Sequence, residues 1–246
     1  MSHLHTYAAT TFAAIAAVAL VQPAHASAAS SRKLVNEIIA HAENVTENTE
    51  QLSEHATTQV AGMICPCLVS AIVKKTTTLQ KLAKDTGLTK KDAKRLESKV
   101  KSLNQRTSAA VDRILETDVN DLPQCVKSAL IILAYGCAPD DLEEHEKVVE
   151  AFRQSVTSAM ENMLLLLKNI DDEESAEGLT SIVVKLDYHL NVITGYMEEL
   201  DESAYEELIE ELGDLGGQVF AAMRDLRGES YFDNSELRKF CENRLN

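Results

Sequence analysis

The spacing of apolar residues in the C-terminal half of the chain limits the fold more than any other feature. Apolar side chains recur there at steps of three and four in three long runs, Val149–Ile170, Val183–Leu200 and Tyr205–Leu226. These steps place side chains along one stripe of an α-helix, and such a stripe must be buried against other helices. Only 9 Gly and 4 Pro interrupt the 246 residues. Since a β-sandwich, barrel or propeller needs turns far more often, the sequence predicts an all-α fold.

A weaker pattern of the same kind predicts further helices in the N-terminal half. They are expected over about 30–60, 68–86, 89–117 and 123–135, the last of them ending at Gly136. In the C-terminal half, Asp201 stands where a helix N-cap belongs, residues 171–178 read as an acidic connection, and a last helix is expected over 234–245. Three glycines inside the run 202–227 predict a kink or a close helix crossing. Because the connections are short, we expect an up-and-down bundle of six to eight heptad-patterned helices.

The first 26 residues have the pattern of a secretory signal peptide. An apolar run over 8–21 is followed by Ala24-His25-Ala26, so cleavage is expected after Ala26 and the protein is expected to be secreted or periplasmic. Residues 1–7 contain no Lys or Arg, which departs from the pattern, and an uncleaved anchor is the alternative. No later segment offers 18 consecutive apolar residues, so we expect no transmembrane anchor in the mature chain.

Charge is distributed unevenly behind a formal net charge of −15, which itself argues against nucleic acid as a partner. Residues 27–137 carry a net charge of +3 and contain a basic stretch, 74–113, of net charge +8, whereas residues 138–246 carry −18. These two regions are expected to pack together as one domain. The basic stretch has three interpretations: solvated helix faces, helices that dock on the acidic region within or between chains, or a patch for anionic surfaces.

The cysteines are the most informative residues for a site. All five lie after the predicted cleavage point, and in an exported protein they are disulfide candidates: Cys65, Cys67, Cys125, Cys137 and Cys241. Each of the three mature prolines lies within two residues of a cysteine, so we expect the cysteines at helix ends and breaks.

Geometry narrows the pairing of these cysteines. Along a helix, Cys125 and Cys137 would be about 18 Å apart at 1.5 Å per residue, far more than the roughly 4.4–6.8 Å between Cα atoms that a disulfide needs. The Cys65/Cys67 segment is therefore expected to pair with Cys137 or Cys125, and one of the five must stay unpaired within the chain. The alternatives are a metal or redox site at Cys65-Pro66-Cys67, or a free thiol or intermolecular bridge.

No catalytic set can be assembled from the histidines. His41 and His55 share one helical stripe with Asn48, and His145 lies one turn after Asp141. None of the four mature histidines follows a Glu by three residues, as a di-iron bundle requires, and the C-x-x-C-H, H-E-x-x-H, G-x-S-x-G and P-loop motifs are missing. We therefore expect no metal, no cofactor and no enzyme activity.

The function expected from these patterns is protein binding. The chain is predicted to be an exported, non-enzymatic bundle that binds a protein partner or a second copy of itself through helix faces. The alternative is a membrane-active, pore-forming-like protein, since residues 60–73 and 128–135 are strongly apolar and could insert into a bilayer.

Overall fold

The computed structural model describes residues 27–56, 61–83, 88–137, 139, 141–168 and 173–227, and over these residues it consists of helices and short connections without a strand. The helices are α3 (Ala28–His55), α4 (Ala61–Ala83), α5 (Lys90–Leu115), the short 3-10 helix η1 (Val119–Asp121), α6 (Gln124–Tyr135), α7 (Leu142–Lys168), α8 (Glu173–Leu200), α9 (Glu202–Glu211) and α10 (Gly213–Arg227). The prediction of an all-α helical bundle is confirmed for this part of the chain. The predicted signal peptide, the predicted helix 234–245 and Cys241 lie outside the described residues.

Local sequence explains where several helices begin and end. The Asp201 carboxylate accepts a hydrogen bond from the Ala204 N–H at 3.0 Å and caps α9 as predicted, while the Thr89 hydroxyl caps α5. Gly136 ends α6 with φ of 81°, a conformation that favours glycine, and donates its N–H to the Ile132 carbonyl at 2.8 Å. These caps satisfy backbone groups that a helix terminus would otherwise leave unpaired.

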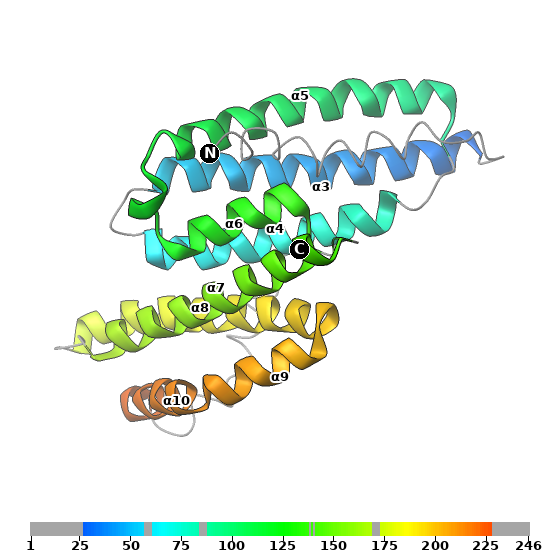
Figure 1. The fold of residues 1–246 in the computed structure, drawn as a ribbon. Helices are drawn as coiled ribbons and strands as arrows, with labels where there is room; N and C mark the ends of the chain where they lie inside the picture. The colour runs from blue at the N-terminus through cyan, green and yellow to red at the C-terminus, as the bar shows by residue number, and fades with distance from the viewer. Residues whose placement is uncertain are drawn as a thin grey trace.

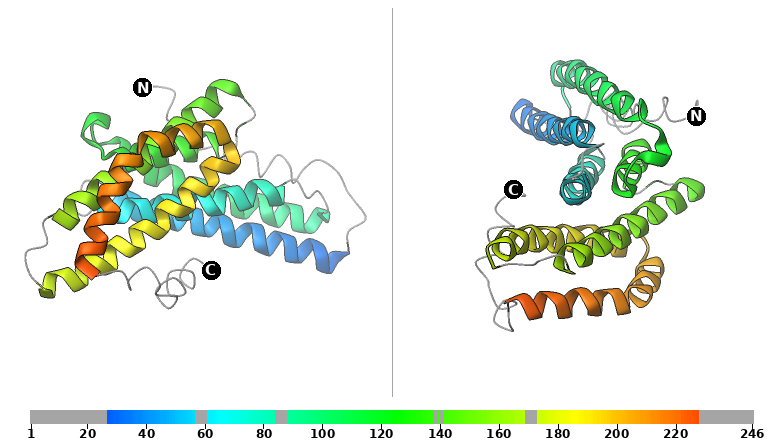
Figure 2. Two further views of the ribbon diagram at one scale, coloured as in Figure 1. Left: turned by 90° about the horizontal axis from the view of Figure 1, so that it is seen from below. Right: turned by 90° about the vertical axis from the view of Figure 1, so that its left-hand side faces the viewer.

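The helices form three layers (Figures 1 and 2). The first contains α3, α4 and α5, which alternate in direction, with α6 beside α4; α3 packs against both α4 and α5. The second layer contains α7 and α8, which pack against each other and against α4. Helices α9 and α10 form the third layer, on the opposite side of the molecule from α5 (Figure 1; Figure 2, right).

One hydrophobic core runs through the first two layers. It includes Leu52 and Ile72 from the first layer and Phe152 and Leu186 from the second, each exposed by no more than 1%. The core is thus continuous across residue 138, where the charge of the chain changes sign. The apolar segments at 60–73 and 128–135 contribute to it through residues such as Val69, Ile72 and Ile132.

No helix among the described residues is both long enough and apolar enough to cross a membrane.

The expectation that Pro66 marks a helix break is wrong. Helix α4 begins at Ala61 and continues through Pro66 to Ala83, so Cys65 and Cys67 lie inside it. Proline removes one backbone hydrogen bond, but Leu68, Val69 and Ile72 follow it on a stripe that is buried in the core, and this burial outweighs the loss.

Two other boundaries differ from the sequence expectation. Helix α8 begins at Glu173, so most of the predicted acidic connection 171–178 is helical; two glutamates at a helix N-terminus are favoured by the helix dipole. The predicted helix 202–227 divides at Leu212 into α9 and α10, and a Cβ on Gly216 would lie 3.5 Å from Met160 of α7. The glycine-rich stretch therefore provides both the predicted break and the predicted close crossing.

Candidate functional site

Two of the five candidate cysteines meet in the core. Cys65, near the start of α4, is 1% exposed, and Cys125, in the first turn of α6, is 5% exposed. The Cys125 side chain interacts with the Cys65 thiol, and all four described cysteines are free thiols in this structure. The structure therefore brings together one of the pairs that the sequence left open.

The other two described cysteines lie elsewhere. Cys137 follows α6 at the opposite end from Cys125, is buried, and its Sγ donates to the Val73 carbonyl at 3.5 Å. Cys67 is half-buried, and at two residues from Cys65 it lies about 200° around α4 from it. Neither occupies the position between α4 and α6 that Cys65 and Cys125 share.

Burial holds the Cys65 and Cys137 thiols in their protonated form. It raises the pKa of the Cys65 thiol well above its ordinary value, and the contact with Cys125 acts in the same direction. Burial also raises the pKa of Cys137 to about 12. The thiolate is the form that attacks substrates and binds metals. Among the described residues, no group of three or more His, Cys, Asp or Glu is placed to hold a metal ion.

A buried serine and a histidine connect the first layer to the second. The Ser70 hydroxyl donates to the Cys67 carbonyl at 3.0 Å and lies 2.5 Å from Nδ1 of His189 on α8. Since a hydroxyl has one hydrogen, Nδ1 of His189 is the donor to Ser70. A serine held in this way, with no exposed surface, joins α4 to α8 and is not positioned as a nucleophile.

The other histidines form ordinary helix-edge contacts. Nε2 of His145 lies 3.3 Å from Asp201 and not against Asp141, whose carboxylate caps α7 by accepting the Glu144 N–H at 3.1 Å. His41 lies half-buried at the edge of α3, where burial and then the charge of Lys75 on α4 lower its pKa. These placements are typical of the polar edge of an amphipathic helix.

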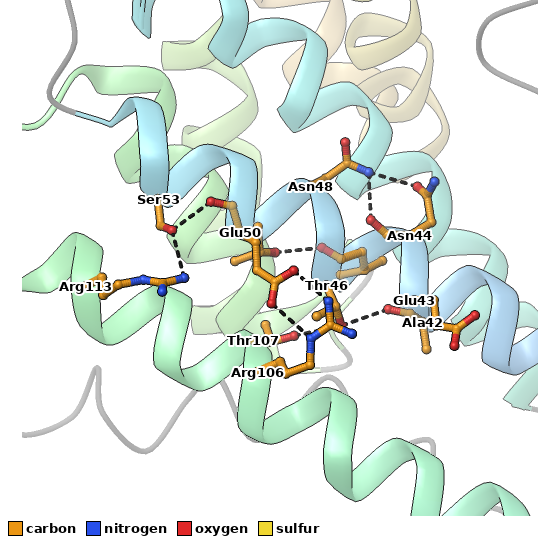
Figure 3. Close-up of polar contacts among 12 residues, drawn as sticks. Ala42, Glu43, Asn44, Thr46, Asn48, Glu50, Ser53, Arg106, Thr107 and Arg113 are labelled. Carbon is orange, nitrogen blue, oxygen red and sulfur yellow. Dashed lines mark hydrogen bonds and ion pairs between the residues drawn. The ribbon is translucent and has the colours of Figure 1, made fainter.

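Helices α3 and α5 meet along a seam with a constant offset in sequence. The Thr46 and Thr107 hydroxyls lie 3.0 Å apart (Figure 3), and Ser31 donates to Asp92 at 2.6 Å; both pairs are separated by 61 residues. A constant offset means that the two helices run parallel. The same offset relates buried apolar residues between these polar pairs, such as Val35 to Leu96.

Charged pairs flank this seam at seven-residue steps. Arg106 holds Glu50 through two hydrogen bonds of 3.0 and 2.7 Å (Figure 3), and one heptad earlier Lys99 lies 2.7 Å from Glu43. The hydrogen bonds from Arg106 lower the pKa of Glu50. The basic helix α5 thus docks on glutamates of α3, within the N-terminal region, and not on the acidic region of its own chain.

Two surfaces of opposite charge remain on the outside of the bundle. The basic surface consists of exposed side chains on α5: Lys90, Lys91, Lys94, Arg95 and Lys101. The acidic surface consists of exposed side chains from the end of α8 to the start of α10: Glu198, Glu199, Glu202, Glu206, Glu207, Glu210, Glu211 and Asp214. Arg153 of α7 pairs with Glu207 and Glu211 at 3.3 and 2.9 Å. No Lys or Arg occurs in the sequence between Lys185 and Arg224.

Comparison of the chain with protein-family models, curated proteins and solved structures finds no match. The function proposed below therefore rests on the surfaces and contacts of the chain itself.

Sequence reasoning missed the Ser70–His189 contact and the α3–α5 seam. The sequence contains a signal for the seam: the residues 61 positions after Ser31, Val35 and Thr46 are Asp92, Leu96 and Thr107, which form polar, apolar and polar pairs with them. The Ser70–His189 contact had none, since it depends on how α4 and α8 cross.

Proposed function

We propose that this chain is an exported, disulfide-tied helical bundle that acts by protein binding rather than catalysis, and that its partner is a second copy of the same chain. The observation that carries the proposal is that α5 and α9, whose exposed side chains form the basic and the acidic surface, lie on opposite sides of one molecule (Figures 1 and 2). The acidic surface of one copy would meet the basic surface of the next.

The acidic surface has the composition of a docking face for a cationic partner. Its eight acidic side chains are exposed, and the apolar side chain of Ile209, 48% exposed, lies among them on α9. Arg153 reaches only the edge formed by Glu207 and Glu211. An apolar side chain within a charged rim is a common pattern in protein interfaces.

The basic surface supplies the complementary charge. Helix α5 packs against α3, and its ion pairs to Glu43 and Glu50 leave Lys94 and Lys101 exposed on another stripe. Because α5 and α9 lie on opposite sides, the two surfaces of one chain cannot meet each other. Contact between copies is therefore heterologous, which produces rings or open chains and not a two-fold dimer.

Sedimentation of the purified protein at several concentrations tests this proposal. Exposed ion pairs contribute only about 0.2–1 kcal/mol each, so the association is weak and screened by salt. In about 20 mM salt we expect the weight-average mass to rise with concentration, and in about 500 mM salt to return to the monomer mass. A monomer mass under both conditions would refute self-association.

Charge-reversal variants identify the surfaces. K94E/K101E changes one stripe of the basic surface and E206K/E210K one stripe of the acidic surface, and each variant alone is expected to remain monomeric. An equimolar mixture should associate again, because each variant retains the surface that the other lacks. The matched control E37K/E161K changes net charge as much as E206K/E210K but on exposed residues of α3 and α7, and it should behave as wild type. If E37K/E161K lost self-association as fully as E206K/E210K, the assignment of the two surfaces would be contradicted.

The membrane-active alternative has less support. It requires the two apolar segments to leave the core, where Val69, Ile72 and Ile132 have no exposed surface. Their removal would expose much of the interface between the first two layers.

A further inference from the structure

We propose that Cys65 and Cys125 form a disulfide that links α4 to α6 when the chain folds in the presence of a disulfide oxidant. This bridge depends on the proposed export only for the supply of that oxidant in the cell. The bridge and self-association are therefore separable: each can be found without the other.

The placement of the two thiols carries this inference. Helices α4 and α6 pack directly against each other and run in the same direction (Figure 1), and Cys137, just after α6, contacts Val73 of α4. Cys125 precedes Cys137 along the chain as Cys65 precedes Val73 on α4, so Cys125 lies level with the start of α4, where it interacts with Cys65. Both side chains belong to the core cluster. The two side chains therefore lie on facing parts of two adjacent helices, where a disulfide would link α4 to α6.

The other described cysteines are not placed to compete for this bridge. Cys137 is directed to the Val73 carbonyl, two turns along α4 from Cys65 and at the far end of α6 from Cys125. Cys67 lies on a different side of α4 from Cys65. Of the two partners that the sequence left open for the Cys65/Cys67 segment, the structure favours Cys125.

The chemistry is two successive thiol–disulfide exchanges. One cysteine thiolate attacks a sulfur of oxidised glutathione, forms a mixed disulfide and releases one glutathione thiolate. The thiolate of the second cysteine then attacks the protein sulfur of that mixed disulfide and releases the second glutathione. The two cysteines lose two electrons, glutathione disulfide gains them, and the two thiol protons end on two molecules of reduced glutathione.

Burial determines when this exchange can occur. In the folded chain neither sulfur is accessible to an external disulfide, and burial disfavours the thiolate form of Cys65. The bridge therefore forms while the chain is still folding. Once formed, it is shielded from reductant by the same packing.

Disulfide mapping of the full chain tests the connectivity. The reduced, unfolded protein is refolded with oxidised and reduced glutathione, the remaining thiols are alkylated, and the protein is digested without reductant. We expect a peptide pair joined through Cys65 and Cys125, with Cys137 alkylated. The same mixture added to protein that has already folded in reduced form should give the bridge much more slowly. Free Cys65 and Cys125 after oxidative refolding, or a bridge from either of them to Cys67, Cys137 or Cys241, would overturn the proposal.

Thermal unfolding gives an independent readout. Closing a loop of this length typically raises Tm by an amount on the order of 10 °C for a chain of this size. Protein that is refolded and scanned in a reductant, so that the bridge never forms, should therefore show a Tm lower by about that shift than protein refolded with the glutathione mixture. C65A/C125A should unfold at the same temperature with and without the reductant, even if both values are low. The matched control C137A, which also removes a buried thiol, should keep the full reductant effect. A wild-type Tm that is independent of reductant would contradict the bridge.

Discussion

The threonine pair in the α3–α5 seam predicts an asymmetric response to substitution. Thr46 donates its single hydroxyl hydrogen to the Ala42 carbonyl at 3.0 Å, so Thr107 must be the donor in the 3.0 Å contact between the two hydroxyls (Figure 3). Both side chains are buried, at 0% and 1% exposure. Valine has nearly the shape of threonine, and replacing either residue therefore removes a hydroxyl without creating a large cavity.

The expected losses follow from which hydroxyl is left without a partner. In T46V the Thr107 hydroxyl is a buried donor that has lost its acceptor, which costs about 1–3 kcal/mol. In T107V the Thr46 hydroxyl keeps its bond to Ala42, so the cost is about 0.5–1 kcal/mol. In T46V/T107V no hydroxyl remains unsatisfied, and the free energy of unfolding should return close to that of wild type.

Urea denaturation of the four proteins measures these differences as a double-mutant cycle. We expect a favourable coupling between the two substitutions of about 1.5–4 kcal/mol, the sum of the two single losses, with the double variant more stable than T46V alone. In a thermal scan, T46V should lower Tm by roughly 2–12 °C for a chain of this length. Equal losses in the two single variants, together with a double variant that shows their sum, would refute this assignment of donor and acceptor.

Two other predictions concern pH and backbone conformation. Hydrogen bonds from Ser31 and Thr89 lower the pKa of Asp92, so its carboxylate contributes stability above the unfolded value of about 3.9 and loses it as the pH falls through the folded value. Acid titration of unfolding should therefore show a smaller loss of stability below about pH 4 for D92N than for wild type or an exposed control, E161Q; identical profiles would count against the role of Asp92. At Gly136, φ is 81° and an added Cβ would lie 2.5 Å from Nε2 of Gln80, so G136A should lower the free energy of unfolding by about 1–3 kcal/mol. G213A, which meets no atom within 4 Å, should change it by less than about 0.5 kcal/mol, and equal effects of the two alanines would contradict the strain argument.

Local sequence signals predicted where the helices lie, but they did not predict which helices pack against each other. The periodic apolar residues and the Gly136 terminus place α6 within one residue of its expected bounds. The expectation of a helix break at Pro66 was wrong because it considered only the backbone hydrogen bond that a proline removes. The apolar stripe that follows Pro66 is buried against other helices, and this tertiary effect is not visible in the local sequence. The start of α8 was missed because acidic residues suit a solvated connection and a helix N-terminus equally well.

For the candidate site, too, local spacing predicted part of the arrangement and tertiary packing decided the rest. Spacing alone could argue against a bridge between Cys125 and Cys137, since a helix of known rise separates them. It could not choose between Cys125 and Cys137 as partner of the Cys65 segment, because that choice depends on which end of α6 crosses the start of α4. The sequence also did not predict that α5 docks on α3. The net charge of each region pointed to the acidic C-terminal region as the partner of α5, whereas Glu43 and Glu50 of α3 form the ion pairs.

The separation of 56–61 residues between contacting positions of α3 and α5 also constrains the order of folding. Each helix can form from nearby residues, but the seam requires the chain to reverse through α4 and return. Such remote contacts carry a loop-closure cost and are made slowly. Among the first three helices, α5 is therefore expected to dock last. Substitutions in the seam should then accelerate unfolding more than they slow folding.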